Sequence, residues 1–383
     1  MENKKGNIFL GIVLVILMIV AIVIVIINPN KIKKTKEISV NEKQENVNLI
    51  SNNVTKEEYI QEEKRMSMQE GNKFCKIDNK IVFYNEDNKT IYLYDLNENK
   101  TSKIATAENG VDKMYFDGES IYFMPSYYMG KGIYKVDLQG NVNKITENSS
   151  LQLYLTDDKI YFVKQIGYDQ INNNPQGTLS SMDKNGENIT TIAENVKNYF
   201  YIQGDKIYYT TQDRKMYSIG LDGTNKQNIL SGRKFVIGTS DKYIIYIDYA
   251  SQEAKHILNL ETNEDTIVGY FGRIYNFQNK KFLQVCRSLD DGSLDDKFSL
   301  LEVNEDGTVK DYGNNISDFA INYIINGNVY LYSNQNSAQV YNVETKQTES
   351  KDEYEGFKYF VGGNAYKIDD SNIEDIKIEK IKL

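Results

Sequence analysis

Short apolar runs, each closed by a polar turn, recur along most of the chain and predict β-strands. The clearest copy lies between Gly204 and Leu230, where the runs at residues 207–210 and 216–219 are rich in β-branched and aromatic side chains. Such side chains suit a pleated surface. Asp222-Gly223 then supplies the positive φ angles that a tight hairpin needs. With the strand before it and the strand that ends it, this region holds four strands in about forty residues, which predicts one antiparallel meander.

The same turn and apolar run occur eight times, with starts separated by roughly 36 to 48 residues. The units begin at Asp78, Asp117, Asp157, Gly204, Asp241, Gln278, Asn326 and Gly362. A period near forty with four strands per unit is typical of a β-propeller, because one four-stranded sheet cannot bury both faces and neighbouring blades cover each other. We therefore predict an all-β fold: a β-propeller of four-stranded antiparallel blades, with eight blades favoured and seven as the alternative.

The last unit has fewer strands than the others. After its first two strands, only residues 376–381 remain for the outer pair. The segment before Asn72 could donate a missing outer strand and so close the ring. Alternatively, its residues from Tyr59 to Met68 could form a short helix.

The amino-terminal region predicts a membrane anchor. Residues 8–27 are apolar and carry no charge, and twenty helical residues at about 1.5 Å each span roughly the 30 Å of a bilayer core. A cleaved signal peptide and a buried helix are the alternatives, but no small-residue cleavage site follows the run. Lysines flank it on both sides, so orientation rests on the rule that long domains are exported largely regardless of flanking charge. We expect a tail (1–7), a single-pass signal anchor (8–27), a polar stalk (28–71) and an extracytoplasmic propeller (72–383) at the cell membrane.

Composition narrows the classes of partner and of chemistry. The net charge of -9 argues against a nucleic-acid partner, since such proteins need a basic face that displaces counterions. Thirty tyrosines and fifteen phenylalanines, with no tryptophan, suit strands. Cys75 and Cys286 are far apart in the repeat scheme and are expected to be unpaired thiols. The single histidine, His256, limits both metal and triad chemistry.

Two runs of the clearest unit carry a family resemblance. They read Ile207-Tyr208-Tyr209-Thr210 and Met216-Tyr217-Ser218-Ile219-Gly220-Leu221-Asp222-Gly223-Thr224-Asn225. They resemble the YWTD-type propellers of lipoprotein-receptor-like proteins, and most closely a bacterial membrane-anchored β-propeller family of unknown function. The resemblance covers residues 72–383. The chain differs from the receptor pattern in having Tyr209 where tryptophan is usual and in having more than six units. The resemblance implies the fold but no catalytic residue.

Unequal loops point to a binding face. In a propeller, the loops between the second and third strands of each blade open on one face with the connections between blades, and functional insertions concentrate on one face of such arrays. The long loops belong to units two, three and six. Their candidate binding residues are Tyr127, Tyr128, Tyr168, Asp169, Asp290 and Asp291. The alternative is that these loops have drifted without acquiring a function.

No motif marks a catalytic, metal or cofactor site. The chain has no nucleophile elbow, phosphate-binding loop or dinucleotide fingerprint. The acidic loop that contains Asp290 and Asp291 could hold calcium, but its spacing is not that of an EF-hand and a solvated turn is favoured. His256 has no second histidine with which to bind zinc. We expect no catalytic residue, no metal and no cofactor.

The sequence thus favours a membrane-tethered, non-catalytic binding or scaffolding module. Its partner would be a protein, a peptide or a cell-envelope glycan. The alternative is a glycan hydrolase or lyase of propeller type acting at the envelope, which would need two or more carboxylates converging on the mouth of the channel. A structural tether without a concave pocket is a third hypothesis.

Overall fold

The computed structural model describes residues 35–37 and 54–383, except 127–130, 149, 151, 170–173, 279, 290–291, 314–315, 317–319, 332–338 and 373–375. The predicted membrane span at residues 8–27 lies outside this part of the chain. Within it, no helix is both long and apolar enough to cross a bilayer.

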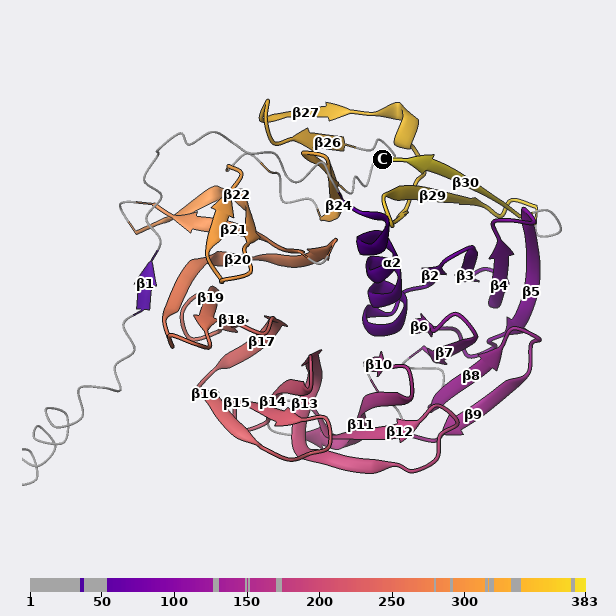
Figure 1. Ribbon diagram of the computed structural model, residues 1–383, viewed down its shortest axis with the longest axis horizontal. Helices are drawn as coiled ribbons and strands as arrows, with labels where there is room; N and C mark the ends of the chain where they lie inside the picture. Colours follow the sequence, from indigo (N-terminus) through magenta and orange to yellow (C-terminus); the bar gives the residue numbers. More distant parts are fainter. Residues whose placement is uncertain are drawn as a thin grey trace, which may run out of the picture.

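The described strands form blades arranged in a ring (Figure 1). Within each blade, consecutive strands pair antiparallel, as the meander pattern predicts. Blades 1 and 2 consist of β2 (Phe74–Ile77), β3 (Lys80–Asn85), β4 (Thr90–Asp95), β5 (Lys100–Thr106), β6 (Lys113–Phe116), β7 (Ser120–Met124), β8 (Ile133–Asp137) and β9 (Val142–Thr146). Blades 7 and 8 consist of β24 (Ile321–Ile325), β25 (Asn328–Leu331), β26 (Gln339–Asn342), β27 (Gln347–Ser350), β28 (Tyr359–Val361), β29 (Asn364–Asp369) and β30 (Lys377–Lys382), with the short 3-10 helix η3 (Asp352–Tyr354) between them.

In the middle of the chain, two long strands each belong to two neighbouring blades. β13 is the outer strand of blade 3 and continues as the inner strand of blade 4, and β20 links blades 5 and 6 in the same way. The strands of blades 3 to 6 are β10 (Leu153–Leu155), β11 (Lys159–Asp169), β12 (Asn174–Asp183), β13 (Thr190–Gln203), β14 (Lys206–Thr211), β15 (Lys215–Gly220), β16 (Gln227–Ser231), β17 (Lys234–Thr239), β18 (Tyr243–Asp248), β19 (Ala254–Asn259), β20 (Asp265–Phe277), β21 (Lys280–Ser288), β22 (Leu294–Val303) and β23 (Val309–Asp311). A short strand, β1 (Thr35–Glu37), pairs parallel with β20.

A glycine allows β20 to pass from one blade to the next. Gly272 has a φ of +76°, and a Cβ there would lie 1.7 Å from the carbonyl oxygen of Gln284 on β21. Any side chain would therefore collide with the neighbouring backbone, in a conformation that only glycine adopts at little cost.

The hydrophobic core lies between the blades. One buried cluster joins blades 1 and 2, another joins blades 2 and 3, and a third joins blades 4 and 5. Ile207 and Tyr209, from the clearest sequence repeat, are fully buried. The repeated apolar positions are therefore scaffold, and the predicted all-β ring of antiparallel blades is confirmed as a fold, with eight blades in the described residues.

Among the described residues before Asn72, none forms a strand of the last blade. Residues 56–70 form α2 (Lys56–Arg65) and the π-helical turn η2 (Met66–Glu70), which lie inside the ring (Figure 1). Blade 8 has three strands in the described residues. Residues 59–68 therefore supply no closing strand, and the short helix is confirmed. Among the described residues, α2 already packs inside the ring, in the stretch expected to be a polar stalk.

Two buried glutamates fix α2 in the ring. Glu62 accepts hydrogen bonds from the Tyr323 hydroxyl, from the backbone N–H of Gln278 (2.8 Å) and from that of Gly362 (3.0 Å). Glu63 forms a buried ion pair with Lys76 on β2. One helix thereby connects blades 6, 7, 8 and 1.

Candidate binding site

Of the predicted binding residues, the structure describes only the backbone of Tyr168 and Asp169. Tyr127, Tyr128, Asp290 and Asp291 lie outside the described part of the chain. Tyr168 and Asp169 belong to β11, where they pair with Pro175 and Asn174 of β12, but their side chains are not described. Their role in binding stays a prediction.

The hairpins that carry several of these residues extend toward one face of the ring. We call this the loop face; in blades 4 and 5 it consists of residues 212–214, 232–233 and 249–253. The opposite, turn face consists there of residues 204–205, 221–226 and 240–242. β11 pairs with β12 as far as Asp169, and β21 pairs with β22 as far as Ser288. The unequal loops of units three and six are therefore long hairpins on the loop face.

On the same face, blades 4 and 5 form a cluster that the sequence did not single out. We call it the cationic–aromatic patch, and it consists of Lys197, Tyr199, Arg214, Arg233, Phe235 and Tyr249. The rings of Tyr199 and Phe235 meet edge to face, with centroids 6.4 Å apart and planes at 80°. The Lys197 ammonium lies 5.7 Å from the Phe235 centroid. Such pairs add specific geometry to the area that the rings bury.

Backbone turns bring the patch residues from four segments of the chain to one place. Lys197 and Tyr199 lie where β13 passes from blade 3 to blade 4. Arg214, with a φ of +63°, closes the turn between β14 and β15, and its N–H donates to the Thr211 carbonyl at 2.9 Å. The Tyr249 N–H donates to the carbonyl of Arg233 at 2.9 Å, which ties the connection between blades 4 and 5 to the loop of blade 5.

The charges of the patch are not neutralised within the described residues. Partial burial, together with the nearby Arg214 and Arg233 guanidinium groups, lowers the pKa of Lys197. No acidic side chain of the described chain forms an ion pair with these three cations. The neighbouring Asp213 instead pairs with Lys215 at 2.8 Å. The patch therefore has positive charge available for a ligand.

Exposed apolar side chains also favour this face. Tyr199 is 42% exposed and Tyr249 46% exposed, although most described tyrosines are buried scaffold. The large hydrophobic side chains exposed on the loop face are Ile166, Tyr199, Tyr249, Phe271 and Leu289. Only Val142 and Ile189 are their described counterparts near the turn face. Exposed aromatic residues beside unpaired cations are typical of recognition surfaces.

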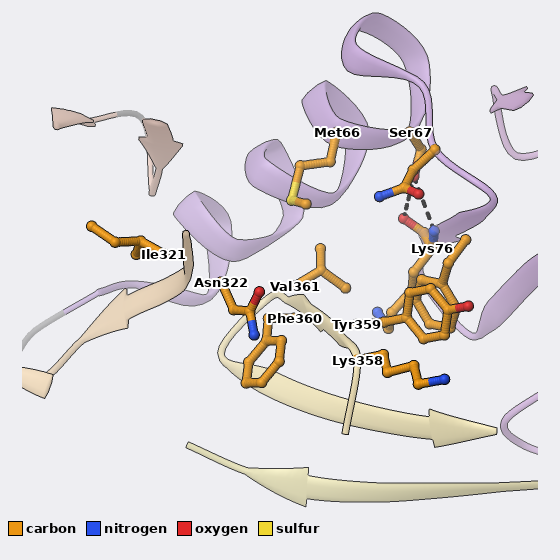
Figure 2. A pocket seen from close by; sticks show the side chains of 11 residues that line it. Met66, Ser67, Lys76, Ile321, Asn322, Lys358, Tyr359, Phe360 and Val361 are labelled. Carbon is orange, nitrogen blue, oxygen red and sulfur yellow. Dashed lines mark hydrogen bonds between the residues drawn. The ribbon is translucent and has the colours of Figure 1, made fainter. Parts of the chain in front are cut away.

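A pocket of about 170 Å³ lies inside the ring beside η2 (Figure 2). Its lining comes from η2, the adjoining Asn72, and the inner strands of blades 7, 8 and 1. The lining residues are Met66, Ser67, Asn72, Phe74, Lys76, Ile321, Asn322, Lys358, Tyr359, Phe360 and Val361. Ser67 Oγ donates to the carbonyl of Lys76 (2.9 Å) and accepts from its N–H (3.0 Å), which holds one wall rigid. No carboxylate lines this pocket, so it does not supply the acid pair that the hydrolase alternative requires.

His256 is a buried strand residue, as its sequence context suggested. It stacks on Tyr246 with centroids 4.6 Å apart, and its Nδ1 lies 3.2 Å from Asp265 Oδ1. The Tyr246 hydroxyl donates to Asp265 Oδ2 at 2.6 Å. Burial opposes ionisation of Asp265, but the hydrogen bonds with His256 and Tyr246 lower its pKa on balance. In the described chain, no three acidic, cysteine or histidine side chains gather as a metal site.

Comparisons with known proteins identify the fold alone. No family model and no curated protein sequence matches the chain. A prolyl endopeptidase structure is 10% identical, covers 78% of this chain and 52% of its own, and has a TM-score of 0.50. An oligogalacturonate lyase in complex with manganese is 13% identical over 80% of this chain and 86% of its own, with a TM-score of 0.41. A nidogen/laminin complex is 12% identical over 49% of this chain and 74% of its own, with a TM-score of 0.33. At these identities the likeness concerns the fold alone, and a shared fold does not imply a shared function.

Proposed function

We propose that the protein is a non-catalytic binding module whose loop face recognises a partner from the cell envelope, either a protein, a peptide or a glycan. The observation that carries this proposal is the cationic–aromatic patch. It combines exposed rings with unpaired positive charge on the face to which the hairpins of blades 3 and 6 also extend.

The patch is built for contact with a partner rather than for chemistry. Arginine and lysine attract an anionic group, and the adjacent rings offer apolar area. Acid–base catalysis on a glycan would instead use carboxylates that converge on the scissile bond. The described pocket beside η2 has none, so no specific observation favours the hydrolase or lyase alternative.

We further propose that residues 8–27 anchor the protein in the cell membrane and that the ring lies outside the cytoplasm. The support is the length and apolarity of that run. Protease added to intact cells that produce the full chain should digest the ring. Protection of the ring until the cells are lysed would contradict the proposed orientation.

Binding through the loop face can be tested with a photo-crosslinking residue at position 249. The matched control places the same residue at Val142, which is similarly exposed (44%) but belongs to the outer strand of blade 2. We expect a discrete adduct in cells from position 249 and none from position 142. Equal labelling at both positions, or none at either, would argue against a binding loop face.

A further inference from the structure

We infer that the cationic–aromatic patch binds an anionic glycan, a polymer whose sugar rings carry carboxylate or phosphate groups. This inference rests on the proposed function and names the ligand class of the same site. Three observations support an anionic glycan as the ligand: the number and spacing of the cations, the orientation of the aromatic rings, and the face of the molecule on which the patch lies.

The cations suit a ligand with spaced negative charges. Lys197, Arg214 and Arg233 come from three separate connections, and no described acidic side chain pairs with them. Lys197 is close enough to both guanidinium groups for their charge to disfavour its own protonation. An anionic group placed among the three would relieve that repulsion, and arginine can hold a carboxylate or phosphate with two parallel hydrogen bonds.

The aromatic rings suit the flat, C–H-rich faces of sugars. Tyr199 and Phe235 form an edge-to-face step, and Tyr249 stands exposed on the next loop. A tyrosine ring contributes large apolar area at little entropic cost, and its hydroxyl remains available for hydrogen bonding. The pocket beside η2 includes none of these residues. The patch therefore presents exposed rings to a ligand.

Other anionic partners fit the molecule less well. Nucleic acid carries a phosphate on each nucleotide, and its binding needs an extended basic surface, whereas this chain has a net charge of -9. An anionic membrane surface is recognised through clusters of roughly four to eight lysine or arginine side chains, whereas the patch contributes Lys197, Arg214 and Arg233.

The test compares two polymers that share a backbone and differ in charge. The full-length chain is applied to surfaces coated with carboxymethyl cellulose or with neutral hydroxyethyl cellulose, at low and high salt. We expect binding to the carboxylated polymer alone, and weakening by salt because the contacts involve exposed charges.

Two sets of variants separate the contributions of charge and stacking. Lys197→Gln with Arg214→Gln and Arg233→Gln should weaken binding about tenfold and reduce its salt dependence. Tyr199→Ser with Tyr249→Ser should weaken binding without changing the salt dependence. The control triple, Lys103→Gln with Lys206→Gln and Lys242→Gln, changes net charge equally but lies on exposed positions away from the patch, so we expect binding to be unchanged.

Each other outcome overturns the inference. Equal binding to the neutral polymer, or equal loss in the control triple, removes the argument from charge. Preferential binding to poly-glutamate, to single-stranded DNA or to anionic lipid vesicles assigns the patch to a different ligand class and leaves the proposed binding function in place. Failure of every probe together with absence of an adduct from position 249 removes both the inference and the proposed function.

Discussion

The protein contains two groups of charged side chains with opposite environments. Glu62 and Glu63 of α2 are buried inside the ring, where each has a hydrogen-bonded or ionic partner. Lys197, Arg214 and Arg233 lie on the loop face without an acidic partner among the described residues. Losing a partner of a buried charge is costly, whereas surface charges contribute little to stability. The comparison assigns the glutamates to closure of the ring and the cations to recognition.

Truncation of the chain tests most sharply whether the buried glutamates of α2 close the ring. A fragment that begins at Asn72 keeps the strands from β2 to β30 but loses α2, η2 and the short strand β1 that pairs with β20. It leaves Lys76 and Tyr323 buried without their glutamate partners. We expect a loss of about 5 kcal/mol or more, comparable with the whole free energy of unfolding of many domains. Circular dichroism should show no cooperative melting for this fragment, in contrast to the full chain. Identical melting curves would mean that α2 is not part of the fold.

A single substitution in α2 should have the next largest effect. Glu62→Ala leaves the Tyr323 hydroxyl and the N–H groups of Gln278 and Gly362 without their acceptor. Because each buried unsatisfied donor costs roughly 1–3 kcal/mol, we expect a destabilisation of about 3–5 kcal/mol. Urea denaturation measures this change. The control is Glu57→Ala, an exposed position on the same helix, whose one side-chain hydrogen bond among the described residues is with Gln61. There we expect less than about 0.5 kcal/mol.

The two groups also differ in how far the sequence predicts them. The blades can be predicted because the turn and apolar run repeat along the chain. An ambiguous unit is therefore interpreted by comparison with the other units. α2 was harder to place, because its sequence, KEEYIQEEKR, has the polarity of a solvated stalk. Nothing local shows that Glu62 and Glu63 would be buried, since their partners lie on distant blades.

The candidate site could not be derived from the sequence for a related reason. Lys197, Arg214 and Arg233 lie in separate turns, and only the ring geometry brings them together. The sequence points to the same face through its unequal loops, but it favours long insertions over charged residues in short turns. The sequence signal that could have indicated the patch is the presence of a cation in each of three successive loop-face connections of blades 3 to 5.

A buried carboxylate in blade 5, that of Asp265, provides a third test of how partners determine the role of a charge. Asp265 in blade 5 bonds both His256 and Tyr246, and these bonds lower its pKa below the usual value near 3.9 despite burial. Its contribution to stability is therefore present above about pH 4 and is lost as pH falls through the lowered pKa. We expect Asp265→Asn to destabilise the protein by about 1–3 kcal/mol at pH 7.

The pH dependence distinguishes this buried site from a surface charge. The difference in free energy of unfolding between wild type and Asp265→Asn should shrink below pH 4. Urea titrations at pH 7 and at pH 3.5 measure it, with Asp205→Asn in an exposed turn as the control. A difference that stays constant between these pH values would mean that the carboxylate of Asp265 is not held ionised by His256 and Tyr246.

The smallest expected effect on stability belongs to the patch itself. Arg214→Gln and Tyr249→Ser remove exposed side chains that have no side-chain hydrogen bond among the described residues, so each should change the free energy of unfolding by less than about 0.5 kcal/mol. Urea denaturation of the two variants checks this expectation. A loss near that of Glu62→Ala would place Arg214 or Tyr249 with the residues that hold the ring together. A protein that keeps its stability yet loses its ligand would show that the exposed cations and rings are retained for recognition, because the fold gains almost nothing from them.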